Sequence, residues 1–407
     1  MILSISWKNI WRNKFRSIII MLAITFGIWT GLFLFAFMVG MGKQRLNSAI
    51  KTEVSHIQIH QPNYLLTDSI ELYIENSSEI VTDINSNPKV KGASSRLLFK
   101  ETIGTTARNN AGFNVIGVNP EQEKKVTDIH ENIIKGSYFE GKKRNPIVIG
   151  EELAEKLDIK ERSRIQISFY NTNGVSLPVT FKVEGIYETN NAQYDQMHVF
   201  VKKEDLASIL GISNNAAHEI AVLLHDGDNL DAVDEELEKA MPDLEVETWE
   251  EGFLVLRYMN DMMDMYMYIF IGIILLALLF GIINTMLMSV MERKKELGML
   301  KAVGMNNRRL FVMILIETVL LSFTGAALGI GLGFTTIGIL GNTGIDLSMW
   351  GEGIEQLGYA PVVYPALDLK YYVIISILVL ITAFIASIFP SVKIIRIKAV
   401  NALRTDN

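Results

Sequence analysis

Four long apolar runs constrain the fold of this chain more than any other feature of its sequence. A helix needs about 20 successive apolar residues to cross the hydrocarbon core of a bilayer. The runs occupy residues 17–41, 265–291, 310–340 and 371–392, and Glu317 is the one charged residue within them. The first run is longer than the apolar part of a signal peptide and lacks a clear small-residue cleavage pattern. The pattern therefore predicts a helical membrane domain with four spans.

The remaining composition indicates that the spans are joined to a large soluble part. The chain is 49% hydrophobic but 20% charged, and its mean hydropathy is +0.25. A chain made mostly of membrane helices would carry less charge, and a soluble domain rarely has a positive mean hydropathy. We assign the soluble part to residues 42–264, between the first and second spans. The chain has no cysteine, so this part depends on its own core and not on disulfides.

Charge asymmetry predicts the orientation. Residues 1–16, 292–309 and 393–407 together hold 14 Lys and Arg against 3 Asp and Glu, whereas the rest of the chain holds 24 against 42. Basic flanks stay in the cytoplasm according to the positive-inside rule. Both termini and residues 292–309 are therefore predicted to be cytoplasmic, and residues 42–264 and the acidic loop 341–370 to lie outside.

Residues 1–16 are predicted to form an amphipathic helix that lies along the headgroups, because Trp7, Trp11 and Phe15 alternate with basic residues. A basic flank that only sets the topology explains this segment equally well. Beyond the first span, the helix is expected to continue outside the membrane through residues 43–51.

The outer segment is predicted to be an α+β domain without an active site. Alternating or apolar runs predict strands, and helical spacing predicts helices. The predicted strands are 55–60, 113–118, 146–150, 164–170, 177–185, 197–201 and 219–224, and the predicted helices are 151–157, 204–210 and 230–241. Asn173 and Gly174 form a hairpin turn signal. We predict no catalytic residue and no metal site, and we interpret His56 and His60 as surface histidines.

Polar and small residues inside the spans predict helix contacts. Glu317 and Asn284 are the intramembrane polar residues that we single out. A carboxylate there is costly unless it has a partner, and we expect a structural ion pair or hydrogen bond with Arg308, Arg309, Asn284 or Thr285 rather than a proton relay. Small residues spaced by four permit close helix approach. They occur in the first span at Gly27 and Gly31 and in the third at Gly325, Gly329 and Gly333.

Residues 292–309 form a charged island that a topogenic loop does not fully explain. Its sequence at 292–304 is ERKKELGMLKAVG. The segment resembles the FtsX/MacB-like permease family of ABC transporters, whose pattern there is E-R-x-x-E-I/L-G-x-x-K/R-A-x-G. Further similar segments are SWKNIWRNK at 6–14, TWE at 248–250, VIGEELAEKL at 148–157, IINTMLMSV at 282–290 and RIKAVNALR at 396–404, where Ala399 replaces the usual Pro.

Length and one-plus-three topology are most similar to the LolC/LolE lipoprotein-releasing branch. The resemblance implies an α-helical four-span domain with a MacB-like periplasmic core domain, in a bacterial inner membrane. It implies a permease without its own ATPase, which pairs with a second permease copy or a paralogue and with two cytoplasmic ABC ATPase subunits of LolD/MacB type. No cofactor is expected on this chain, and ATP and Mg are expected on the partner.

The resemblance also assigns residues. The island would be a coupling helix, with seven ATPase-coupling residues: Glu292, Arg293, Glu296, Gly298, Lys301, Ala302 and Gly304. Acyl chains would sit between the first and second spans, where the candidates are Phe33, Phe37, Met41, Met262 and Met265. A periplasmic LolA-like chaperone is a further expected partner. In LolC a long hook grips that chaperone, and the corresponding loop between Tyr170 and Leu177 is short here.

The leading hypothesis is a permease that extracts lipoproteins from the inner membrane for transfer to the chaperone and the outer membrane. The alternatives are MacB-like export of antibiotics or peptides and FtsX-like regulation of cell-wall hydrolases. A receptor is less well supported because the cytoplasmic segments are short, and an enzyme is the least supported.

Overall fold

The computed structural model describes residues 7, 11–12, 14–141, 144–170 and 176–395. The chain divides into two units. The helical unit comprises residues 1–42, 262–345 and 363–407, and the α+β unit comprises residues 43–261 and 346–362.

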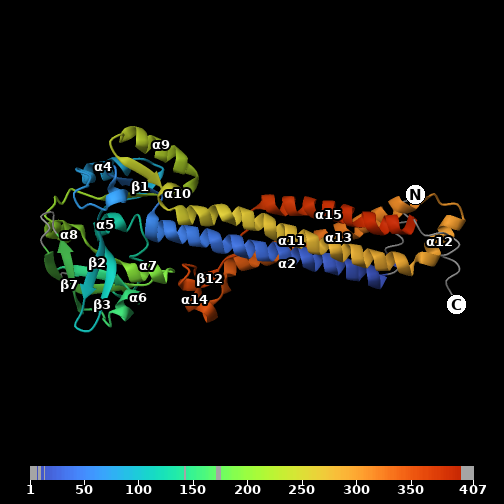
Figure 1. Ribbon diagram of the computed structural model, residues 1–407, viewed down its shortest axis with the longest axis horizontal. Helices are drawn as coiled ribbons and strands as arrows, with labels where there is room; N and C mark the ends of the chain where they lie inside the picture. The colour runs from blue at the N-terminus through green and yellow to red at the C-terminus, as the bar shows by residue number, and fades with distance from the viewer. Residues whose placement is uncertain (1–6, 8–10, 13, 142–143, 171–175, 396–407) are drawn as a thin grey trace. The chain divides into compact units, whose positions relative to one another are not determined.

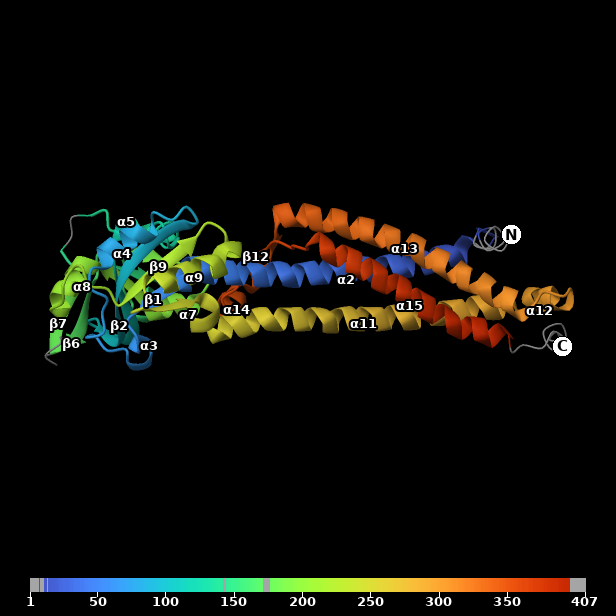
Figure 2. The same ribbon diagram turned by 90° about the horizontal axis from the view of Figure 1, so that it is seen from above.

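The helical unit is built on four helices that are long and apolar enough to cross a membrane. They run side by side in both views (Figures 1 and 2). The helices are α2 (Lys14–Ala49), α11 (Leu254–Glu292), α13 (Asn307–Thr343) and α15 (Leu369–Ile395). All four extend beyond the apolar runs. The continuation predicted after the first span is confirmed, because α2 reaches Ala49 and a π-helical turn, η1 (Ile50–Val54), follows.

The small residues of the spans lie where helices meet. A Cβ placed on Gly325 would lie 3.0 Å from Ile24 Cβ, and one on Gly333 would lie 2.9 Å from a methyl group of Leu32. The glycine face of α13 therefore receives α2, as its spacing predicted. The Thr25 hydroxyl also donates a hydrogen bond to the Gly325 carbonyl oxygen at 3.0 Å.

The α+β unit contains a large mixed sheet, whose strands are β1 (Ile57–His60), β2 (Val90–Thr105), β3 (Asn110–Val118), β4 (Ile133–Gly136), β5 (Pro146–Gly150), β6 (Arg164–Tyr170), β7 (Ser176–Tyr187), β8 (His198–Lys202), β9 (Glu219–Leu224) and β10 (Glu245–Thr248). Its helices are α3 (Tyr64–Thr67), α4 (Ser77–Ile84), α5 (Pro120–Glu123), α6 (Glu151–Lys156), α7 (Ala192–Met197), α8 (Lys203–Leu210), η2 (Gly227–Asn229), α9 (Leu230–Ala240) and α10 (Trp249–Gly252).

Short elements complete the chain: α12 (Lys294–Ala302), β11 (Ile345–Asp346), η3 (Ser348–Trp350), α14 (Gly351–Glu355) and β12 (Val362–Val363).

Strand β6 closes part of the sheet into a ring. The strand order is β10-β1-β9-β2-β3-β8-β5-β7-β4, and β6 pairs with both β7 and β2. Strands β2, β3, β8, β5, β7 and β6 therefore form a closed circuit. Phe113, Ile149, Phe181 and Val201 belong to one buried apolar cluster supplied by these strands. Closure removes exposed strand edges from this part of the sheet.

A bulge lets β2 take part in two pairings. Its first half pairs with β9, its last residues pair with β6, and the register along β3 shifts between Phe99 and Thr102. Glu101, within the shift, has a φ of 52°. A bulge adds a residue and increases the local twist, so one long strand can leave the β9 pairing and enter the ring.

The α+β fold class and each of the seven predicted strands are confirmed. The hairpin of β6 and β7 is also present, with Tyr170 paired with Ser176, although residues 171–175 lie outside the described part. Strand β2 was not predicted, because Ser94, Ser95 and Arg96 interrupt any apolar alternation although all three are buried. The interpretation of His60 as a surface residue is wrong, because it is fully buried.

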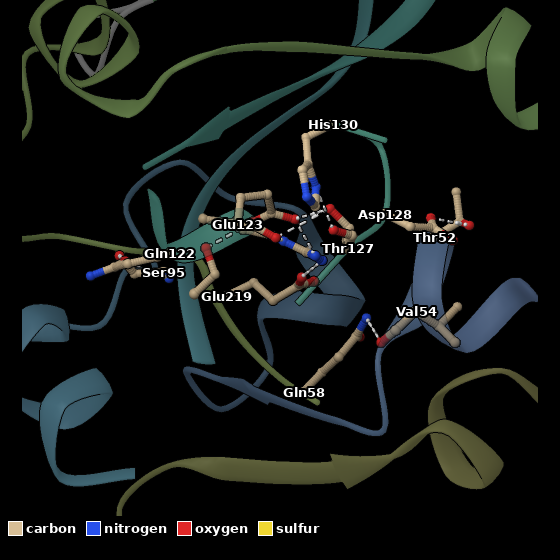
Figure 3. A network of polar contacts seen from close by, with 12 residues as sticks. Thr52, Val54, Gln58, Ser95, Gln122, Glu123, Thr127, Asp128, His130 and Glu219 are labelled. Carbon is tan, nitrogen blue, oxygen red and sulfur yellow. Dashed lines mark hydrogen bonds and ion pairs between the residues drawn. The ribbon is translucent and has the colours of Figure 1, made fainter. Parts of the chain in front are cut away.

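His60 is buried beside Glu219. Glu219 and Glu123 belong to a network of charged side chains (Figure 3). Arg96 donates to Glu123 at 2.6 and 3.2 Å and to Glu219 at 2.8 Å. Glu219 also contacts His60 Nε2 at 3.3 Å. Burial alone would raise the pKa of Glu219, but His60 and the Arg96 charge outweigh burial and hold it at about 2. Each buried carboxylate therefore has a cationic or hydrogen-bonding partner, as burial of charge requires.

Replacing Gly329 tests the close packing of α2 on α13. A Cβ there would lie 2.8 Å from Thr25 O and 3.0 Å from Ile28 Cβ. Overpacking of this kind typically costs about 1–3 kcal/mol, so we expect Gly329→Val to lower the thermal unfolding midpoint of the full chain in detergent. Gly331→Val is the matched control, since nothing lies within 4 Å of its Cβ position. Equal midpoints for the two variants would contradict the packing.

Candidate coupling site and membrane groove

Helix α12 connects α11 to α13 and lies at one end of the helical unit (Figure 1). Leu297 and Gly298 are buried, so this side of α12 packs against the helical unit. The helix ends before Gly304, whose φ of +100° favours a residue without a side chain. Asn306 then begins α13 by accepting a hydrogen bond from the Arg308 backbone N–H.

Arg293 ties α12 to α13. Its Nη1 lies 2.9 and 3.1 Å from the two carboxylate oxygens of Glu317, and its Nε lies 3.2 Å from Glu296 Oε2. Both members of the Arg293–Glu317 pair are largely buried, with side-chain exposures of 11% and 8%. Glu296 also pairs with Arg12.

The prediction of a structural ion pair at Glu317 is confirmed, but the predicted partners are wrong. Arg308 and Arg309 are exposed. Asn284 is exposed on α11, and the Thr285 hydroxyl donates to the Gly281 and Ile282 carbonyl oxygens of its own helix. The cation that pairs with Glu317 is Arg293, at the start of the island.

Lys301 also holds the island, because its Nζ donates to the Ile395 carbonyl oxygen of α15 at 2.7 Å. Three of the predicted coupling charges, Arg293, Glu296 and Lys301, thus bind within the unit. Glu292, Ala302 and Gly304 are exposed. The largest exposed apolar side chains here are those of Met299 and Val303, at 53% and 88%. The exposed surface of the island therefore combines these apolar side chains with charged ones, namely Glu292, Lys295, Arg308 and Arg309.

A second feature is an apolar groove between α2 and α11, with a cavity volume of about 460 Å³. It forms beside Gly27 and Gly31, where Leu278 and Ile274 approach to 2.9 and 2.8 Å of the glycine Cβ positions. Its residues include Phe26, Thr30, Leu34, Ala277 and Gly281. The sequence did not predict these groove residues. It did predict a close helix contact at Gly27 and Gly31, and the groove lies beside that pair.

The five residues predicted to contact acyl chains do not line this groove. Phe37 follows Thr30 by seven residues, about two turns of helix, so it continues the groove-lining stripe of α2, and Met41 follows it. Phe33, like Phe37 and Met41, is half-buried. Met262 and Met265 are exposed on α11. Met265 precedes Ile274 by nine residues, about two and a half turns, and so lies on the opposite side of α11.

Two family comparisons cover most of the chain. Residues 17–240 match the MacB-like periplasmic core domain, and residues 268–399 match the FtsX-like permease C-terminal family. The chain belongs to the FtsX/MacB-like family of ABC transporter permeases. The predicted family is therefore confirmed. This permease is a membrane protein with an extracellular domain, and its family implies a cytoplasmic ATPase partner.

Individual relatives are distant. The ABC transporter permease YvrN of Bacillus subtilis is 26% identical, and the alignment covers 98% of each chain. The lipoprotein-releasing system transmembrane protein LolE of Haemophilus influenzae is 21% identical over 77% of this chain and 74% of its own. Among solved structures, the extracellular domain of YknZ from Gram-positive bacteria is 15% identical with a TM-score of 0.34, covering 47% of this chain and 99% of that domain.

Removing one member of the buried pair tests the link between α12 and α13. Arg293→Met leaves the Glu317 carboxylate buried without this cation, and breaking a buried pair typically costs about 3–5 kcal/mol. We expect a lower thermal midpoint in detergent, and partial recovery when Glu317→Gln is added, because the second change removes the stranded charge. Arg308→Met, at an exposed site, should leave the midpoint unchanged. A midpoint for Arg293→Met that equals that of Arg308→Met would contradict the link.

Proposed function

We propose that this permease transmits work from a partner ATPase through α12 to its membrane helices, and that it uses this work to extract lipoproteins from the inner membrane. The observation that carries the proposal is the buried Arg293–Glu317 pair, which joins the start of α12 to α13. In this scheme both termini and α12 are cytoplasmic and the α+β unit is periplasmic.

The coupling proposal rests on how α12 is held. Arg293 fixes it to α13 and Lys301 fixes it to α15, so a push on α12 moves these helices unless a buried contact breaks. The ATPase would bind the exposed side formed by Met299, Ala302 and Val303. In this proposal the ATPase binds ATP and Mg, and this chain provides the surface on which the ATPase docks.

The cargo proposal rests on the groove. Fourteen residues of α2 and α11 line it, and among them only two threonines carry a polar side chain. An acyl chain gains about 0.8 kcal/mol for each CH₂ group that it buries, so a groove of this character suits lipid chains. The similarity to LolE supports lipoprotein as the cargo. A second permease copy or a paralogue would complete the transporter, as the family resemblance implies.

Delivery to a LolA-like periplasmic chaperone completes the scheme. The loop that would meet the chaperone includes residues 171–175, which lie outside the described part of the chain. Strands β6 and β7 hold its ends, Tyr170 and Ser176, in register. A short loop offers less surface than a long hook, so chaperone capture here would use neighbouring residues as well.

Export of small molecules or peptides is the second candidate function, favoured by the match of residues 17–240 to the MacB-like core domain. FtsX-like control of cell-wall hydrolases is the third. Depletion of the permease separates them. Lipoproteins that accumulate in the inner membrane support release, hypersensitivity to antibiotics without accumulation supports export, and a division or wall defect alone supports regulation.

Val303→Glu tests the docking surface. The Val303 side chain is 88% exposed, so the change should not disturb the fold, but it would bury a charge at an apolar interface. We expect the amount of ATPase that copurifies with the permease in detergent to fall at least about tenfold, equivalent to about 1.4 kcal/mol of binding free energy. Val255→Glu, at a 72% exposed site on α11, is the control. If the Val303→Glu variant copurifies with as much ATPase as the unchanged permease, the proposed interface is wrong.

Ala277→Trp tests the groove as the cargo path. Ala277 lines the groove and is exposed to it, so an indole there occupies space that an acyl chain would take. In depleted cells we expect this variant to restore lipoprotein release several-fold less than the unchanged permease, while it still copurifies with the ATPase. Ala327→Trp, at an exposed position of α13 outside the groove, should restore release fully. Full restoration by both variants would exclude the groove.

A further inference from the structure

The α+β unit contains a polar cavity of about 590 Å³ that the proposed transport function does not use. It lies where β3 and β8 end, and these strands run parallel, with Val118 paired with Lys202. Parallel strands bring their carboxyl ends, and the polar residues that follow, to one edge of a sheet. The polar residues that line the cavity include Ser95, Asn119, Gln122, Lys202, Lys203 and Asn215. Its volume is within the range of about 300–1,000 Å³ that holds small ligands.

Lys203 is the central feature of this cavity. The residue is only 5% exposed. Its Nζ donates to the hydroxyl oxygens of Ser77 at 3.0 Å and Ser95 at 2.7 Å. An ammonium group has three N–H donors, so two are used and one is left for a further acceptor.

No carboxylate among the described residues forms an ion pair with Lys203. Glu79 and Glu204 also line the cavity, but both are exposed, and water screens their charge. Burial lowers the pKa of Lys203 to about 8. The amine therefore remains mainly protonated at neutral pH, as a buried cation whose contacts on the protein are neutral hydroxyls.

The N-terminus of helix α8 also faces this region. Lys203 is its first residue, no side chain in the described part caps its N-terminus, and Glu204 and Asp205 lie in its first turn. The first N–H groups of a helix point outward and carry partial positive charge, which favours an anion. Lys202, half-buried on the cavity wall, brings a second cation.

Neighbouring amides would recognise the rest of a ligand. The Gln122 side-chain oxygen approaches the Ser95 hydroxyl at 3.5 Å (Figure 3). The Asn215 side-chain oxygen accepts the Ser78 N–H at 3.0 Å, and its NH₂ group donates to Asn76 Oδ1 at 3.5 Å. One N–H of that NH₂ group is left to donate to a ligand. Amide and hydroxyl groups of this kind match hydroxyls or amides on a small polar molecule.

We propose that this cavity binds a small polar anion, whose carboxylate or phosphate group contacts Lys203 Nζ and the N-terminal N–H groups of α8. Neither of the two hydroxyls bonded to Lys203 Nζ is charged, so the anion provides a bonded negative charge, and the third N–H donor of Lys203 binds it. The site is outside the membrane unit, so it is independent of the groove and of the ATPase surface.

The test is titration calorimetry on the full chain in detergent with two probes, inorganic phosphate and N-acetylglycine. Saturable binding of at least one probe is expected. Lys203→Met should weaken it at least about tenfold, equivalent to about 1.4 kcal/mol. Lys239→Met is the matched control, because Lys239 is exposed on α9 and bonded to Glu235, and it should bind like the unchanged protein. Which probe binds separates a phosphate ligand from a carboxylate ligand.

A pH series with N-acetylglycine gives a second measurement that needs no variant. As the pH rises through about 8, unliganded Lys203 loses its proton, so the affinity should fall about tenfold between pH 7 and pH 9, following the fraction of protonated amine. Lys203→Met should lack this pH dependence. Absence of binding by both probes, or binding that neither Lys203→Met nor the pH change weakens, would overturn the proposal.

Discussion

The arrangement of the membrane end of this permease depends on one buried ion pair, Arg293 with Glu317. Taking both charges out of water is costly, and the attraction between Arg293 Nη1 and both carboxylate oxygens of Glu317 offsets part of that cost. Arg293 comes from the start of α12 and Glu317 from the interior of α13. The pair therefore links the start of the island to the interior of α13. A displacement of α12 either moves α13 or separates two buried charges.

This arrangement reverses the expected use of the charged motif. Arg293, Glu296 and Lys301 bind Glu317, Arg12 and the end of α15, while Met299 and Val303 remain exposed. These three charged residues hold the island in place, and the exposed apolar side chains are available for an interface. Because these three residues bond within the helical unit, α12 is already fixed in position before a partner binds. Such preorganisation lowers the entropy lost on binding.

The sequence predicted features that depend on local spacing and failed where distant residues meet. Span lengths and the glycine face of α13 follow from periodicity, so the four helices and their close contact could be predicted. The partner of Glu317 could not. Arg308 and Arg309 are near in sequence, but eight or nine helical residues correspond to about 12–14 Å along the axis. Strand β2 was missed for a related reason, since the counter-ions that bury its Arg96 come from α5 and β9.

Strand β2 also shows that this domain buries cations in two different ways. Ser95 and Arg96 are adjacent, so their side chains leave opposite faces of the strand. On one face, Arg96 meets two carboxylates, and the charges compensate within the protein. On the other, Ser95 meets Lys203, which has hydroxyl partners and a 590 Å³ polar cavity beside it. Arg96 is neutralised by carboxylates of the domain itself, whereas Lys203 lies beside a cavity. This difference is consistent with an anion that binds at Lys203.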